Sequence, residues 1–247
     1  MDVELLKARM LPAVAARFNE LWRQLGSGEG KSPGPQGSHR ICTADALALR
    51  AGGIIGPASD APTKGWVVPF SVVEEKSTGT RLRWIAWPRV KNATLEDDAD
   101  VPLEHVARYL PAVHAEVAAC LDLKASFYQV PLPVEARACF RCIAENGAVM
   151  ELHRLPMGYR ASPEVMQLLT SAVRSEYRAP PEVHIDVWID NIRLWGTEAA
   201  VQEWTKRVLL VATEAQVTWG ETLIATPRYQ FVGVSFDHCQ KTVKLGD

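Results

Sequence analysis

The sequence predicts an α+β fold in which strands and helices alternate in a defined order. Strand-like apolar segments end at Asp122, occupy residues 183–195 as a hairpin, and recur at residues 229–236. Helical spacing of apolar residues separates them, first from residue 162 and again after Thr197. The core order is therefore strand, helix, strand, strand, helix, strand, which is the split β-α-β (ferredoxin-like) arrangement.

The chain begins with an expected amphipathic helix over residues 2–25. Its apolar positions recur every three or four residues, and they are Val3, Leu6, Met10, Val14, Phe18, Trp22 and Leu25. Pro12 should kink this helix, because proline removes a backbone donor. The apolar stripe must pack either on the body of the chain or on a protein partner. The following residues are rich in Gly, Ser and Pro, so we expect a flexible linker over 26–40.

Two hairpins are expected before the core is complete. Residues 66–73 and 81–87 are typical of strands, and the turn Lys76-Ser77-Thr78-Gly79 joins them. A second hairpin should turn at Asn146-Gly147, a dipeptide that favours tight turns. We interpret this second hairpin as an insertion into the core order.

The core helices and the central hairpin carry clear boundary signals. Ser162-Pro163-Glu164 is typical of a helix start, and Thr197 is a candidate cap for the second helix. Between them, the strand 183–189 should return as the strand 192–195, with Asp190 and Asn191 in the tight turn.

Two carboxylates stand where apolar strands end. Asp122 ends one strand, and Asp190 lies in the turn of the central hairpin. In the split β-α-β topology the first strand and the central hairpin are neighbours, so these carboxylates should meet. Paired strand-end carboxylates are what a divalent-metal site for phosphoryl transfer requires.

Composition limits the class of partner. The net charge of -2 argues against a protein that coats nucleic acid over its whole surface. The segment between Lys64 and Lys91 is locally basic, which suits a phosphate-rich partner, and acidic residues follow at 96–104. We find no signal peptide and no apolar stretch long enough to span a membrane, so the expectation is a soluble, intracellular protein with no membrane partner. The Cys139-Phe140-Arg141-Cys142 pair has zinc-knuckle spacing but no second ligand pair, so buried thiols are expected there.

Five motifs in order resemble those of reverse transcriptases (RNA-directed DNA polymerases), over most of residues 45–247. They are Asp122-Leu123-Lys124-Ala125-Ser126-Phe127-Tyr128-Gln129, Leu155-Pro156-Met157-Gly158-Tyr159 with Ser162-Pro163, Trp188-Ile189-Asp190-Asn191, Phe231-Val232-Gly233-Val234, and the hairpin 76–92 with Arg83 and Arg89. The first two motifs resemble retrotransposon enzymes, of the tyrosine-recombinase (DIRS-like) or gypsy-like groups.

The resemblance implies the fingers and palm subdomains of a polymerase. The fingers would be residues 41–115 and the palm residues 116–247, with 131–155 returning to the fingers. The last strand of the palm would be the primer-grip strand, and no thumb or RNase H segment would be present.

The resemblance also implies a mechanism and a set of site residues. Mg²⁺, with Mn²⁺ as an alternative, would be held by Asp122, Asp190, Asn191 and the carbonyl of Leu123, and Asp122, Asp190 and Asn191 would be the catalytic set. The incoming dNTP would contact Lys76, Arg83, Phe127, Met157 and Gly158, with Phe127 excluding a ribose 2′-hydroxyl. An RNA or DNA template with its primer would contact Arg89, Trp188, Phe231 and Gly233.

The chain departs from the reverse-transcriptase pattern at three positions. Asn191 replaces the usual second carboxylate, and losing that charge should weaken metal binding by roughly 1–3 kcal/mol. Trp188 replaces a tyrosine, and the lysine expected near position 221 is absent, with Glu221 nearby and Arg228 as a candidate substitute. Two functions stay open, a reverse transcriptase and a polymerase-shaped nucleic-acid-binding or scaffold protein without catalysis. A regulatory subunit docked through helix 2–25 is a third.

Overall fold

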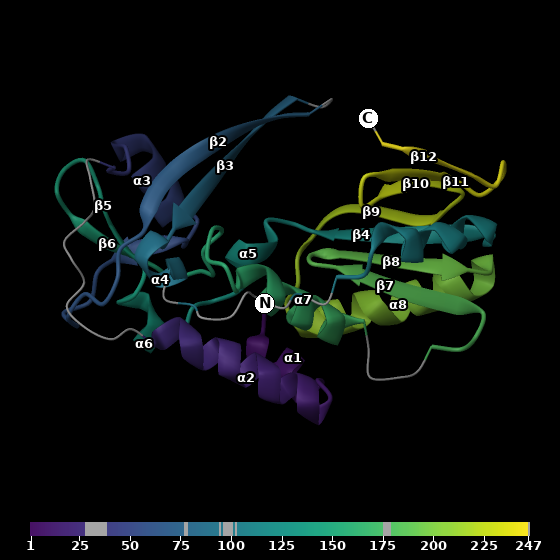
Figure 1. Cartoon of the computed structure of the whole chain (residues 1–247), viewed down its shortest axis with the longest axis horizontal. Helices are drawn as coiled ribbons and strands as arrows, with labels where there is room; N and C mark the ends of the chain where they lie inside the picture. Colours follow the sequence, from purple (N-terminus) through teal and green to yellow (C-terminus); the bar gives the residue numbers. More distant parts are fainter. Residues whose placement is uncertain are drawn as a thin grey trace. The chain divides into compact units, whose positions relative to one another are not determined.

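The computed structural model describes residues 1–27, 39–76, 79–93, 95, 101, 103–174 and 179–246, with only the backbone of 74–76 and 79–82. These residues form a mixed α+β structure with two compact units (Figure 1). The first unit comprises Met1–Phe18, Val101–Ser126 and Pro163–Asp247, and the second comprises Asn19–Asp100 and Phe127–Ser162.

A four-stranded antiparallel sheet forms the centre of the first unit, with strand order β7-β8-β4-β9. Along the chain its elements are β4 (Val117–Leu123), α7 (Ser162–Val173), β7 (Val183–Trp188), β8 (Asn191–Gly196), α8 (Glu198–Glu214) and β9 (Trp219–Thr226). This is the strand and helix order that the sequence predicts, and it places β4 directly beside the β7–β8 hairpin.

The last strand of this sheet is not the predicted one. The sheet is completed by β9, whereas residues 229–236 form a separate hairpin of β10 (Arg228–Phe231) and β11 (Val234–Asp237), extended by β12 (Thr242–Leu245). The prediction missed β9 because β9 is an edge strand with no fully buried residue and with an irregular register against β4. Val232 and Gly233 both have positive φ (51° and 71°), which turns the chain between β10 and β11.

Two layers cover the faces of the β7-β8-β4-β9 sheet. Helix α8 packs along all four strands and buries Val201, Trp204, Val208 and Val211, which lie three or four residues apart. A cluster of buried residues joins β4 to the β10–β11 hairpin and to the 3₁₀ helix η1 (Val106–His114). It consists of Tyr109, Ala112, Val113, Ala118, Tyr229, Phe231, Val234 and Phe236.

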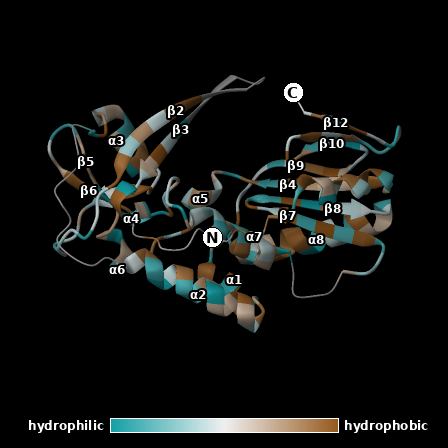
Figure 2. Ribbon diagram, in the orientation of Figure 1, coloured by the Kyte–Doolittle hydropathy of each residue, from teal (hydrophilic) through white to brown (hydrophobic). Residues whose placement is uncertain are grey.

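The N-terminal segment forms two helices, which corrects the single kinked helix expected over residues 2–25. Helix α1 spans Val3–Ala8 and α2 spans Pro12–Gly26. Pro12 starts α2 because the first helical position needs no backbone N–H partner. Hydrophilic and hydrophobic segments alternate along α2 (Figure 2). Leu6 and Phe18 of the predicted stripe are fully buried within this chain, so a partner could reach them only if these helices moved.

The second unit contains two small sheets. Strands β2 (Val68–Lys76) and β3 (Gly79–Trp87) form the predicted antiparallel hairpin, and β1 (Ile55–Pro57), β6 (Val149–Leu152) and β5 (Arg141–Ile143) form the other sheet. The predicted turn at Asn146-Gly147 joins β5 to β6, with Gly147 at a φ of 84°. Besides the end of α2, the described part of this unit contains the short helices α3 (Thr43–Ala51), α4 (Arg89–Ala93), α5 (Ser126–Gln129), which begins in the first unit, and α6 (Val134–Arg137).

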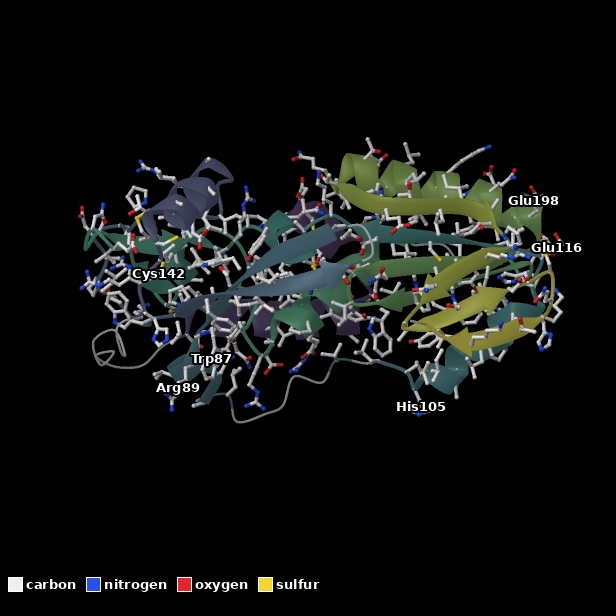
Figure 3. All side chains as sticks on the ribbon, turned by 90° about the horizontal axis from the view of Figure 1, so that it is seen from above. Trp87, Arg89, His105, Glu116, Cys142 and Glu198 are labelled. Carbon is white, nitrogen blue, oxygen red and sulfur yellow. The ribbon has the colours of Figure 1, made fainter. Side chains whose placement is uncertain are left out.

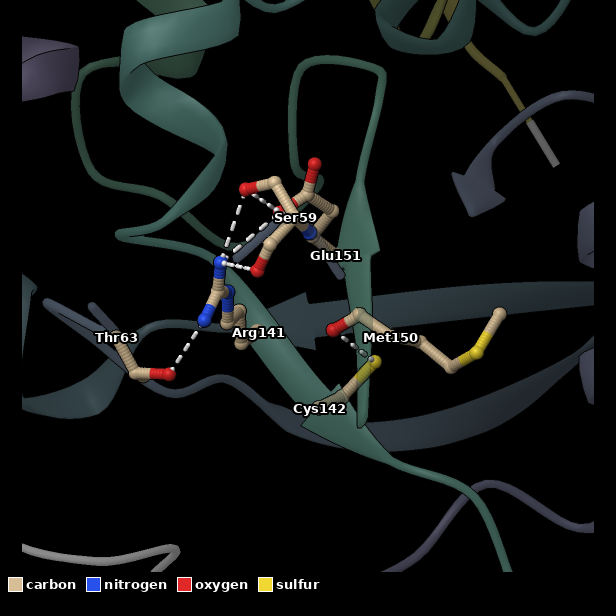
Figure 4. A network of polar contacts seen from close by, with 6 residues as sticks. All are labelled: Ser59, Thr63, Arg141, Cys142, Met150 and Glu151. Carbon is tan, nitrogen blue, oxygen red and sulfur yellow. Dashed lines mark hydrogen bonds and ion pairs between the residues drawn. The ribbon is translucent and has the colours of Figure 1, made fainter. Parts of the chain in front are cut away.

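A buried ion pair fastens a loop to the β1-β6-β5 sheet (Figure 4). Arg141 and Glu151 lie opposite each other on β5 and β6, 3.3 Å apart, and each side chain is 5 % exposed. Arg141 also donates to the Thr63 hydroxyl (2.7 Å) and to the Ser59 carbonyl (2.8 Å). The guanidinium therefore anchors the segment from residue 59 to residue 63.

Parts of three expectations lie outside the described residues. These are most of the linker (28–38), the turn residues Ser77 and Thr78, and the acidic stretch 96–100. Among the helices that are described, none has both the length and the apolar character needed to cross a membrane.

Candidate active site

The register of the central sheet brings the predicted acidic site together. Asp122 of β4 is the direct cross-strand partner of Asn191 of β8. The Leu123 amide donates to the Asp190 carbonyl at 3.0 Å, which links the end of β4 to the β7–β8 turn. Two carboxylates 68 positions apart in sequence (190 minus 122) therefore stand at the same end of one sheet.

The turn itself is one residue earlier than expected. Asn191 begins β8 and pairs with Trp188, so Ile189 and Asp190 form the two-residue loop, rather than Asp190 and Asn191. Ile189 has a φ of 53°, a left-handed conformation that β-branched residues rarely adopt. The loop projects Asp190 at the sheet end.

Both carboxylate oxygens of Asp190 accept a hydrogen bond. The Ser126 hydroxyl donates to Oδ2 at 2.7 Å, and Asn191 Nδ2 donates to Oδ1 at 3.0 Å. Ser126 is itself buried at the start of α5, immediately after β4. The sequence motif that contains Ser126 indicated no role for it, and the structure shows that it orients Asp190.

The space beside Asp122 depends on a glycine of β9. A Cβ placed on Gly220 would lie 2.8 Å from Asp122 Oδ2, so any other residue there would crowd the carboxylate. Asp122 is half-buried, as is Asp190. The absence of a side chain at position 220 therefore avoids a clash with the Asp122 carboxylate.

The donor chemistry of this end of the sheet fits a hard cation. Asp122, Asp190, Asn191 and the Leu123 carbonyl supply oxygen atoms, the ligand type that Mg²⁺ and Mn²⁺ prefer. Within the described residues there is no group of three or more His, Cys, Asp or Glu placed to hold a metal ion. Two carboxylates suit Mg²⁺ sites in which substrate phosphates supply further ligands.

A buried arginine lies behind the site. Arg193 of β8 is fully buried, and its guanidinium lies 4.4 Å from the centre of the Phe231 ring and 4.9 Å from that of Phe236. It donates to the Asp186 carboxylate (2.5 Å from Nη2) and to the Tyr109 carbonyl (3.0 Å). The sequence did not single out Arg193, because an alternating strand pattern does not reveal a charge paired across the sheet.

The expected primer and template residues have different environments. Trp188 packs edge-on against Tyr109, and the Phe231 side chain is 5 % exposed in the aromatic cluster. The Val232-Gly233 turn is therefore more accessible than the Phe231 ring. A small cavity of about 260 Å³ lies between this turn and Asn191. Arg89, in the second unit, lies over the ring of Trp87 at 5.9 Å (Figure 3).

The expected nucleotide-binding residues lie in the second unit. Gly158 has a φ of 118°, and a Cβ there would lie 3.0 Å from the Ala86 carbonyl of β3. The Ala86 amide donates to the Met157 carbonyl, and Asn92 donates to the Gly158 carbonyl at 2.8 Å. These contacts bind the loop containing Met157 and Gly158 to β3 and α4.

The remaining members of that set belong to β2, β3 and α5. Arg83 is half-buried in β3 opposite Val72, and Phe127 is half-buried in α5. Lys76 ends β2, and its side chain lies outside the described residues. The acidic set therefore lies in one unit, and the residues of the expected nucleotide set lie in the other.

The structure also shows the surroundings of the candidate lysine substitute and of the two paired cysteines. Arg228, the candidate substitute for the missing lysine, forms an ion pair with Asp237 at 2.8 Å, and Glu221 is an exposed residue of β9. Cys139 and Cys142 are buried thiols that contact the carbonyls of Gly26 and Met150. Burial raises the pKa of Cys142 to about 12, which disfavours the thiolate that zinc requires.

Solved structures of foamy virus enzymes share this fold. A foamy viral protease-reverse transcriptase in complex with double-stranded DNA matches with a TM-score of 0.72 and 14 % identity, over 100 % of this chain and 48 % of that chain. Native prototype foamy virus protease-reverse transcriptase matches with a TM-score of 0.66 and 20 % identity, over 95 % of this chain and 32 % of its own. A selenomethionine-labelled mutant of that enzyme gives 0.65 and 20 %, over 90 % and 29 %.

The chain therefore has a reverse-transcriptase-like fold, and it spans less than half the length of these structures. No protein-family model matches the sequence, and no curated protein matches it either. At these identities the likeness concerns the fold alone.

Proposed function

We propose that this chain is the fingers and palm of an RNA-directed DNA polymerase, which adds dNTPs to a primer 3′-hydroxyl. The observation that carries the proposal is the cross-strand pairing of Asp122 with Asn191, which sets Asp190 at the same sheet end. A fold without catalysis has little reason to gather two half-buried carboxylates, because like charges at one site disfavour ionisation.

In this proposal the first unit is the palm. Asp122, Asp190, the amide oxygen of Asn191 and the Leu123 carbonyl would hold Mg²⁺, which when bound activates the primer hydroxyl and offsets charge on the triphosphate. Ser126 keeps the Asp190 carboxylate oriented. Gly220 avoids crowding of the Asp122 carboxylate.

The second unit would supply the fingers. Lys76 and Arg83 would bind the β- and γ-phosphates, and the planar guanidinium of Arg83 suits bidentate phosphate contact. Phe127 would exclude a ribose 2′-hydroxyl, and Met157 and Gly158 would line the nucleotide. The backbone at Gly158 is exposed, which allows the close approach that a nucleotide needs.

A template with its primer is the proposed macromolecular partner. The foamy viral neighbour was solved with double-stranded DNA, which favours this class of ligand for the shared fold. Arg89, Trp188 and the turn at Val232-Gly233 would contact it. The proposal includes a retrotransposon origin, which is supported only by the sequences of the motifs that begin at Asp122 and Leu155.

A second candidate is a polymerase-shaped nucleic-acid-binding or scaffold protein. Asn191 favours it, because the Asn191 amide donates to Asp190 instead of adding a second negative charge. The ion pair of Arg228 with Asp237 favours it too, because it occupies the candidate substitute for the lysine that is absent near position 221.

Primer extension separates the two candidates. The wild-type chain would be assayed on RNA and DNA templates with dNTPs in Mg²⁺ and Mn²⁺, beside Asp122→Asn and the exposed-carboxylate control Glu221→Gln. Extension that survives Glu221→Gln and vanishes in Asp122→Asn supports the polymerase. Tight primer–template binding without extension, even after Asn191→Asp, supports the scaffold.

A further inference from the structure

The β7–β8 turn is strained at Ile189. A β-branched residue at a φ of 53° places Cβ against its own carbonyl, and such conformations cost on the order of 1–3 kcal/mol unless surrounding contacts hold them. Ile189 directly precedes Asp190, so its backbone angles set the direction of that carboxylate. Something outside the turn must stabilise this conformation.

Gln167 of α7 makes that contact. Its Oε1 accepts the Ile189 amide at 2.5 Å, and its Nε2 donates to the Val187 carbonyl at 3.2 Å. The side chain therefore bonds the hairpin on both sides of Trp188. Gln167 is 6 % exposed, and without its side chain the partly buried Ile189 amide would lose this hydrogen-bond acceptor.

We propose that Gln167 is a positioning residue, which holds Ile189 in the left-handed conformation and so keeps Asp190 beside Asp122. The meaning of this role for catalysis rests on the proposed function, whereas the control of the turn does not. A buried glutamine that only satisfies its own polar atoms would have no specific link to the conformation at residue 189.

The link can be tested by making Gln167 unnecessary. Glycine adopts positive φ at no steric cost, so Ile189→Gly should remove the strain that Gln167 opposes. The set would be Gln167→Leu, Ile189→Gly and the double variant. Thr170→Val is the matched control, because Thr170 is a fully buried polar residue in the same helix.

Amide hydrogen exchange at residue 189 is the first readout, and single-nucleotide incorporation is the second. We expect exchange to be faster by about tenfold or more in Gln167→Leu, the equivalent of roughly 1.4 kcal/mol, and unchanged in Thr170→Val. Incorporation should fall in Gln167→Leu, whereas the same substitution made in Ile189→Gly should have little further effect.

An unchanged exchange rate at residue 189 in Gln167→Leu would overturn the proposal. It would also be overturned if Gln167→Leu reduced nucleotide incorporation equally in the wild-type chain and in Ile189→Gly. If the wild-type chain incorporates no nucleotide, the proposed function fails, and amide exchange alone decides the role of Gln167. If the wild-type chain incorporates nucleotides but the exchange rate at residue 189 is the same in Gln167→Leu, the proposed function stands and this inference is wrong.

Discussion

Asp122 and Asn191 are direct cross-strand partners on β4 and β8, and the Asn191 amide donates to the carboxylate of Asp190. Residue 191, which is an aspartate in the reverse-transcriptase pattern, is therefore a neutral asparagine that donates a hydrogen bond to Asp190. This pairing makes residue 191 the most informative position to change.

Asn191→Asp should strengthen divalent-cation binding. A carboxylate adds one negative charge at the sheet end, which is worth roughly 1–3 kcal/mol, or about five- to 150-fold in affinity. Apparent Mn²⁺ affinity and the metal dependence of primer extension would measure it, with Asn191→Ala as the companion variant. An Asn191→Asp chain that binds metal no better than the wild-type chain would argue against a metal site there.

Gly158→Ala should destabilise the loop that carries Met157. The residue has a φ of 118°, and the added Cβ would lie 3.0 Å from the Ala86 carbonyl, so both strain and crowding oppose alanine. We expect a loss of about 1–3 kcal/mol in the free energy of unfolding, measured by urea titration. Gly53→Ala is the control, since Gly53 also has positive φ (66°) but nothing lies within 4 Å of an added Cβ. Equal losses in the two variants would mean that contact with β3 contributes nothing.

The Asp186–Arg193 pair should respond asymmetrically to removal of each partner. Asp186→Ala leaves the fully buried Arg193 guanidinium without its carboxylate, which should cost about 3–5 kcal/mol. Arg193→Met leaves Asp186, whose side chain is 22 % exposed and able to reach water, within an aromatic cluster that accepts an apolar side chain. Urea unfolding should therefore show a larger loss for Asp186→Ala, and the opposite order would refute the role assigned to burial.

Stability should fall as pH drops below about 6.5, and His238 should cause part of the loss. Burial lowers the His238 pKa from 6.5, helped by the positive charges of Lys241 and Arg193, while Asp237 and the bond to the Ala115 carbonyl act in the opposite direction. The unfolded chain thus binds a proton that the folded chain does not, so this stability is present above pH 6.5 and is lost as pH falls through the folded pKa. His238→Asn should flatten the dependence of melting temperature on pH. The remaining slope includes His153, whose pKa burial also lowers. A variant with the same slope as wild type would show that His238 does not contribute.

Much of the central sheet could be predicted from sequence, because its signals are local. The helix starts at Ser162 and Thr197 and the strand-end position of Asp122 follow from residue type and spacing, as does the Asn146-Gly147 turn of the second unit. From these the strand order follows by topology, and with it the placement of Asp122 and Asp190 at the same end of the sheet.

The parts that failed depend on contacts distant in sequence. Edge strand β9 has no apolar alternation of its own, and it is held by pairing with β4. The turn lies one residue earlier than predicted because Ile189 adopts a left-handed conformation. Gln167, 22 residues earlier in the sequence, stabilises this conformation by a hydrogen bond to the Ile189 amide. Pro12 interrupts the helical pattern as expected, but it begins the separate helix α2 instead of kinking one long helix. Propensity could not reveal Ser126 or Arg193 as site residues, because each gains its role from a partner across the fold.

The most direct test of the proposed metal centre is to measure, by electron paramagnetic resonance, how tightly Mn²⁺ binds to the chain in the presence of primer–template and dNTP. Wild type, Asp122→Asn, Asp190→Asn and the control Glu221→Gln would be compared. We expect each of the two aspartate substitutions to weaken binding by roughly tenfold or more, the effect of one lost charge at a partly buried site, and Glu221→Gln to leave binding unchanged. Equal binding in wild type and Asp122→Asn would contradict a metal centre at the end of β4, and with it the proposed polymerase.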